Sequence, residues 1–183
     1  MDPLTITTRD DLRAWDVPSR VPLLVLRSTH VFPLGVTAAQ VTGTGDVAAV
    51  RALSTRRPIV VVVRADTPAP AAAELAGRVG VAAIVLDRMN LAAAAVQVTL
   101  LGKHRVTIEA VEPGEAGSVA RISPLLEPEE EHDALTRQVG AVLRHAAVLA
   151  SLDPAVVPEL VETLEENAAD PSHFADLIAA QLP

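Results

Sequence analysis

The residues whose spacing most suggests chemistry are two glycines and two acids. Residues 43–48 (GTGDVA) fit the G-x-G-x-x-[GA] pattern, and Asp66 follows about 20 residues on, after an apolar run. In a dinucleotide-binding fold such glycines let the backbone approach a pyrophosphate, and the acid holds the ribose. Here the preceding residues 37–41 form only a weak strand, Asp46 would place a carboxylate beside the phosphates, and no later βα units follow. We therefore interpret the segment as a glycine turn leading into a helix capped by Asp46, and we expect no cofactor.

Patterns for metal ligands and nucleophiles are equally sparse. The five histidines contain no HExxH and no i, i+4 pair, and the acidic run 127–133 lacks the spacing of a calcium loop. The absence of cysteine excludes disulfides, thiolate catalysis and cysteine-ligated metals. A serine–lysine dyad has one candidate base, Lys103, and no motif around a serine. We expect a chain with no metal site and no catalytic residue.

The composition indicates an aliphatic core and excludes several classes of partner. Hydrophobic residues make up 50% of the 183, but the aromatic residues are only Trp15, Phe32 and Phe174. Stacking on single-stranded nucleic acid needs more aromatic side chains, and the formal charge of -8 has the wrong sign for a phosphate backbone. No secretory signal is visible, and the longest apolar runs, such as 59–63, are too short to span a membrane. We expect a cytoplasmic protein that binds neither nucleic acid nor membranes.

Charge divides the chain into two regions. Residues 1–126 carry 13 basic and 11 acidic side chains, whereas residues 127–183 carry 2 and 12. The first region is rich in β-branched and alternating runs, which predict strands, with short helices at 47–53 and 69–76. The predicted strands are 23–26, 58–63, 78–86, 95–101, 105–111 and 118–122. Because no segment after residue 78 has room for a crossover helix, the later strands should pair by hairpins, with a turn at 102–104.

The second region predicts three helices, each announced by an acidic residue before a proline. Glu127-Pro128, Asp153-Pro154 and Asp170-Pro171 suit the N-cap and first-turn positions, although Pro158 would move the second start forward. The fold class is therefore α+β. An N-terminal β-rich, barrel-like antiparallel subdomain (1–126) precedes a C-terminal, acidic three-helix subdomain (127–183).

Several segments, taken in order, resemble a known family. Residues 21–35 (VPLLVLRSTHVFPLG) are similar to the opening of the N-terminal domain of Lon proteases, with its P-x-x-x-L-R-x-x-x-V-F-P pattern. Residues 79–84 and 102–106 resemble the family's V-G-T-x-A-x-I strand and G-x-x-R-[VA] hairpin. Residues 170–182 (DPSHFADLIAAQL) resemble its last helix. The chain departs from the family at 37–44, where an apolar stretch and a basic G-R are usual.

The resemblance implies a function without catalysis in these residues. In Lon this module captures unfolded or tagged protein substrates, while ATPase and Ser-Lys protease domains lie downstream in the same chain. The resemblance also implies a homo-hexameric, ATP-dependent protease acting in protein quality control, of which this chain is expected to be an isolated N-terminal fragment. A structural role in hexamer assembly and gating, with the acidic helices as contact surface, is the alternative.

Capture of unfolded protein requires apolar side chains left in water. The candidates are loop residues that a core does not obviously claim. Met89 is the only internal methionine, and its flexible thioether suits contact with varied partners. We predict that Met89 lies in an exposed turn between a strand that ends near Leu86 and one that starts near Ala95. For Phe32 and Leu91 the alternative is that their side chains fill the barrel core. The predicted substrate-binding residues are Phe32, Pro33, Leu34, Met89 and Leu91.

Overall fold

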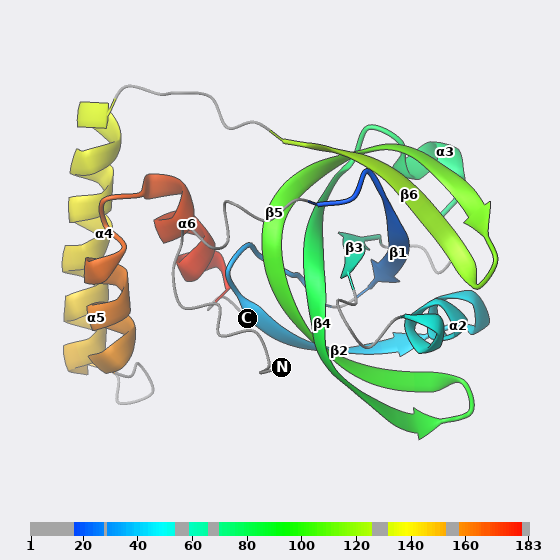
Figure 1. The fold of residues 1–183 in the computed structure, drawn as a ribbon. Coiled ribbons are helices and arrows are strands. Elements are labelled where there is room, and N and C mark those ends of the chain that lie inside the picture. Colours follow the sequence, from blue (N-terminus) through cyan, green and yellow to red (C-terminus); the bar gives the residue numbers. More distant parts are fainter. Residues whose placement is uncertain are drawn as a thin grey trace, which may run out of the picture. The chain divides into compact units, whose positions relative to one another are not determined.

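A computed structural model describes residues 17–27, 29–53, 59–65, 70–125, 132–152 and 158–180 (Figure 1). The chain forms two compact units. The first, the β unit, comprises Met1–Val31 and Val36–Leu125, and the second, the helical unit, comprises Phe32–Gly35 and Leu126–Pro183.

The β unit is one six-stranded sheet that curls almost into a ring (Figure 1). Its order is β2-β5-β4-β3-β1-β6, and a further pairing of β5 with β6 closes the far side. The strands are β1 (Arg20–Leu26), β2 (Val36–Thr42), β3 (Ile59–Arg64), β4 (Val79–Ala92), β5 (Ala95–Gly114) and β6 (Gly117–Pro124). The α+β class is confirmed, but the sheet is mixed and not wholly antiparallel, since β1 and β3 run parallel. They can do so because 32 residues, including β2 and a helix, separate the two strands and provide the crossover.

Alternation along the strands builds two cores, one on each face of the central strands. In β3, Val60 and Val62 enter one core while Val61 and Val63 enter the other, which explains the unbroken run of β-branched residues. The first core is completed by α2 (Thr44–Ala52) and the second by Leu75 of the short helix α3 (Ala72–Leu75). The strand β5, which is 20 residues long, contributes to both cores.

The predicted turn at 102–104 is wrong, because β5 runs through it without a break. The pairing of β4 with β5 shifts register there: Ala82 lies opposite His104, and Ala83 lies opposite Gly102. Lys103 is thus the extra residue of a bulge, and its side chain is buried. A bulge bends a strand while keeping its pairing, so the chain changes direction without leaving the sheet.

The helix predicted at 47–53 begins earlier than expected. The first residue of α2 is Thr44, its N-cap is Gly43 with φ 118°, and no side chain caps it. Asp46 lies inside the first turn and is not the cap. A glycine accepts this left-handed conformation, which a side chain rarely adopts, so Gly43 sets the start of the helix.

Three helices form the described remainder of the helical unit. They are α4 (His132–Leu152), α5 (Pro158–Glu166) and α6 (Pro171–Ala179), and they share a small core around Val139, Leu164 and Phe174. The predicted cap of the third helix is confirmed, since the Asp170 carboxylate accepts a hydrogen bond from the backbone N–H of His173. The predicted starts at Glu127-Pro128 and Asp153-Pro154 lie outside the described residues. None of the helices in the described ranges is long and apolar enough to cross a membrane.

Candidate functional site

The hairpin of β4 and β5 carries two of the predicted substrate-binding residues. Met89 is 52% exposed and Leu91 is 47% exposed, so Leu91 does not fill the barrel core. The prediction of a turn at Met89 is wrong, because Met89 lies within β4, opposite Gln97 of β5, and the turn is at 93–94. Cross-strand pairing therefore extends well past the predicted strand end at Leu86.

Residues 86–92 of β4 are all exposed, and they extend beyond the described pairing of β4 with β3, which ends at Ile84. Register shifts fall at Leu86 and at Leu91, which have no residue directly opposite them on β5. A bulged residue leaves the regular alternation between the two faces of the sheet. Leu86, which is 50% exposed, was not among the predicted binding residues. We call Leu86, Met89 and Leu91 the β4 patch.

Two arginines hold the hairpin against the end of α2. Nη1 of Arg88 donates to the backbone oxygen of Val50 at 2.7 Å and to that of Leu53 at 3.3 Å. Arg51, in the last turn of α2, donates through Nη2 to the backbone oxygen of Ala92 at 3.0 Å. The Arg88 cation thus satisfies carbonyl groups at the helix C-terminus, where positive charge is favourable. The β4 patch is consequently presented on a braced hairpin.

The other predicted binding residues lie in the segment Phe32–Gly35. The backbone N–H of Gly35 donates to the oxygen of Phe32 at 3.1 Å, and Leu34 has a positive φ of 61°. The segment is part of the helical unit, where a Cβ at Gly35 would lie 3.9 Å from that of Ala180. Phe32 therefore does not belong to either core of the β unit.

The structure thus groups the predicted residues into two sets. Met89 and Leu91 share the hairpin of the β unit, whereas the other three share one turn in the helical unit. Those three, each partly exposed, are Phe32, Pro33 and Leu34.

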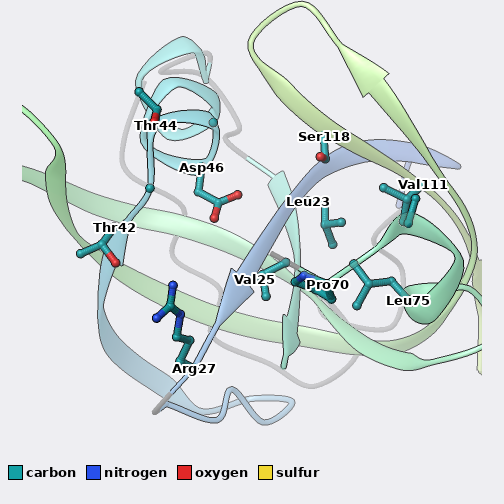
Figure 2. Close-up of a pocket in the computed structure, with 13 residues that line it drawn as sticks. Leu23, Val25, Arg27, Thr42, Thr44, Asp46, Pro70, Leu75, Val111 and Ser118 are labelled. Atoms are coloured by element: carbon teal, nitrogen blue, oxygen red, sulfur yellow. The ribbon is translucent and has the colours of Figure 1, made fainter. Parts of the chain in front are cut away.

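A pocket of about 320 Å³, which we call the α2 pocket, opens beside the N-terminus of α2. Figure 2 shows Leu23 and Val25 of β1 along its floor, with Leu75 of α3 and Val111 of β5 nearby. The polar side is formed by Gly43 and the first residues of α2, by Thr42 and Ser118, and by Arg27 beyond the end of β1. All lining residues belong to the β unit.

Two charged side chains face the α2 pocket from different elements. The Asp46 carboxylate projects from α2, and the Arg27 guanidinium projects from beyond the end of β1 (Figure 2). Burial raises the pKa of the Asp46 carboxyl above its ordinary value of 3.8. Within the described part of the chain, neither side chain has a hydrogen bond or an ion pair. Both groups therefore have capacity for a partner that enters the pocket.

Part of this pocket is formed by the G-x-G-x-x-[GA] match, which the sequence analysis considered as a dinucleotide-binding motif. Residues 43–46 of this motif line the pocket. The flanking strands β2 and β3 are not neighbours in the sheet, so no βαβ unit of the dinucleotide-binding kind is formed. Asp66, the proposed ribose ligand, lies outside the described residues. The sequence does not indicate the apolar floor of the pocket, because Leu23 and Val25 have the pattern of ordinary core residues and Leu75 is distant from them along the chain.

Metal ligands and histidines give no alternative site in the described ranges. No group of three or more His, Cys, Asp or Glu side chains close enough to hold a metal ion occurs there. His30 Nε2 lies 2.8 Å from Nη1 of Arg64, and because arginine can only donate, this nitrogen is the acceptor. The side chains of the acidic run 127–133 lie outside the described set.

Comparison with known proteins identifies the family. Residues 20–183 match the family described as the ATP-dependent protease La (LON) substrate-binding domain. The Lon protease of Trichlorobacter lovleyi is 29% identical over 187 aligned positions, which cover 97% of this chain and 22% of that protein. The chain thus spans about a fifth of this curated relative.

One solved structure shows the same fold. The N-terminal domain of Mycobacterium avium complex Lon protease aligns with a TM-score of 0.65 and 23% identity, covering 88% of this chain and 82% of that one. The Lon N-terminal domain protein from Xanthomonas campestris aligns at 20% identity over 91% of this chain and 100% of that one, with a TM-score of 0.44. Because the family match covers most of the sequence, the chain belongs to the LON substrate-binding domain family.

Proposed function

We propose that this domain captures unfolded or tagged proteins through the β4 patch, assisted by Phe32, Pro33 and Leu34. The observation that carries the proposal is the exposure of Leu86, Met89 and Leu91 within six residues of one strand. Exposed apolar side chains that cluster in this way are typical of protein-binding surfaces. Methionine and leucine side chains adapt to varied sequences, which suits a site that must accept many substrates.

The bracing of the hairpin supports the same proposal. Arg88 and Arg51 fix the hairpin to α2 through backbone carbonyl groups, so the patch is held in place before a substrate arrives. Binding to a pre-organised surface loses less conformational entropy than binding to a loose loop. In a full-length, cytoplasmic, ATP-dependent protease, the domain would pass captured segments to ATPase and Ser-Lys protease domains.

A charge substitution within the patch tests the proposal. Met89→Asp should weaken binding of a fluorescently labelled, reduced and alkylated polypeptide by roughly tenfold, because an ionised carboxylate cannot be desolvated against apolar side chains. Val79→Asp is the matched control, since Val79 is 51% exposed at the other end of β4. Fluorescence anisotropy measures the affinity, and circular dichroism verifies folding. Equal affinities for Met89→Asp, Val79→Asp and the unaltered chain would refute capture by the β4 patch.

A role in assembly is the second candidate, and a face of α4 favours it. Val148 is 55% exposed, Leu149 56% and Leu152 74%, and these residues share one side of the helix. We propose in this alternative that a second copy of the chain covers this face. Leu149→Glu together with Leu152→Glu should then lower the mass measured by light scattering at high protein concentration. A monomer at all concentrations would exclude assembly through α4.

A further inference from the structure

We propose that the α2 pocket binds an aliphatic side chain of an extended polypeptide, while Asp46 and Arg27 hydrogen-bond to the flanking peptide groups. The inference deepens the proposed function and rests on it, because it assigns a second contact for the captured segment. The pocket lies apart from the residues of the β4 patch, none of which lines it.

The size and lining of the pocket fit one aliphatic residue together with its flanking peptide groups. Its volume of about 320 Å³ is at the lower end of the range for ligand sites. The apolar part of the lining consists of leucine, valine, proline and alanine side chains, with no aromatic residue among them. Leu23 and Leu75 are almost fully buried and belong to the second core, so they form a fixed base beneath the partly exposed side chains of Val25 and Val111. Burying an aliphatic side chain against this surface would provide binding energy roughly in proportion to the area covered.

The two opposite charges on the pocket disfavour ligands with a single net charge. A phosphate or carboxylate that binds Arg27 would also meet the Asp46 carboxylate, and an ammonium group that binds Asp46 would also meet the Arg27 guanidinium. A peptide chain offers N–H donors and carbonyl acceptors together and carries no net charge. Asp46 can accept from the N–H and Arg27 can donate to the carbonyl oxygen. Each of these side chains would then gain the partner that it lacks in the described part of the chain.

Titration with blocked amino acids tests the pocket directly. N-acetyl-leucine N-methylamide should shift backbone amide signals of residues 43–46, Val111 and Ser118 in two-dimensional NMR spectra of the full chain. Its affinity should exceed that of the blocked glycine probe by about tenfold, because glycine has no side chain to bury. Blocked lysine and blocked glutamate should both bind more weakly than blocked leucine. Equal affinity for the leucine and glycine probes would overturn the proposal.

Variants distinguish the hydrogen bonds from the apolar contact. Asp46→Ala and Arg27→Ala should each lower the affinity for the leucine probe by roughly fivefold. Arg121→Ala, which removes an exposed ion pair with Glu109, is the control and should leave the affinity unchanged. Arg27 lies outside the two cores, so its variant keeps the test valid if Asp46→Ala fails to fold. If the leucine probe binds Arg27→Ala as tightly as the unaltered chain, Arg27 does not hydrogen-bond to the peptide group, and the proposed mode of peptide binding is wrong.

The two proposals fail separately. If the leucine probe leaves the pocket signals unmoved while Met89→Asp abolishes binding of the unfolded polypeptide, the pocket inference is wrong and capture by the β4 patch stands. If the probe fills the pocket but the unfolded polypeptide does not bind, the pocket is a site and the proposed function is wrong.

Discussion

Removing the Arg88 side chain should loosen the β4–β5 hairpin and lower the stability of the β unit by about 2 kcal/mol. The part-buried hydrogen bond to the Val50 oxygen is charge-assisted and short at 2.7 Å, which corresponds to roughly 1.5 kcal/mol. The loss of a cation at the C-terminus of α2 adds about 0.5 kcal/mol. The longer, exposed contacts to Arg51 and Leu53 add little beyond this.

Urea unfolding and amide hydrogen exchange together test this estimate. Arg88→Ala should unfold at a lower urea concentration with an unchanged m-value, and amides of residues 86–97 should exchange faster than those of β3. Arg88→Lys, which keeps the charge but loses the planar fork of donors, should lose about 1 kcal/mol. Arg121→Ala is the matched control, because its ion pair with Glu109 is exposed and should contribute less than about 0.5 kcal/mol. If Arg88→Ala proves no more damaging than Arg121→Ala, the bracing of the hairpin by Arg88 is refuted.

Three further measurements follow from the structure. Because burial raises the pKa of Asp46, its contribution to stability is full below its unfolded pKa and falls as pH rises through the folded pKa. As the pH rises from about 3 to 6, the free energy of unfolding of Asp46→Asn, measured in urea, should therefore increase relative to that of the unaltered chain. A difference between the two chains that does not change with pH would contradict this prediction. Asp170→Ala removes the cap of α6 and should destabilise the helical unit by about 1 kcal/mol, with Asp170→Asn nearly neutral in the same denaturation assay. Raising the salt concentration should increase hydrogen-exchange protection more in residues 127–183 than in 1–126, since the former carry 2 basic and 12 acidic side chains; equal changes would argue against charge repulsion there.

Elements with a strong local pattern were predicted well from the sequence. The alternation of Val96, Val98 and Leu100 identified a half-buried strand, and these side chains are fully buried. Asp170 before Pro171 identified a capped helix start because the cap is made by residues three positions apart. Patterns of this kind depend on neighbours along the chain, so the sequence displays them directly.

Features that depend on distant pairing could not be predicted in the same way. The bulge at Lys103 exists because β4 changes register against β5, and a single strand carries no record of its partner. The same holds for the register shift at Leu86. The parallel pairing of β1 with β3 and the assembly of Leu23, Asp46 and Leu75 around one pocket also need tertiary structure.

The segment Phe32–Gly35 has a consequence for how the chain can fold. It belongs to the helical unit, yet the residues on both sides of it belong to the β unit. About 90 residues, Val36–Leu125, separate it from the rest of its own unit. Closing a loop of that length is entropically unfavourable until the intervening chain has become compact. The contacts of residues 32–35 with the rest of the helical unit therefore depend on a compact arrangement of residues 36–125, so the two units do not fold as independently as their separate cores would suggest.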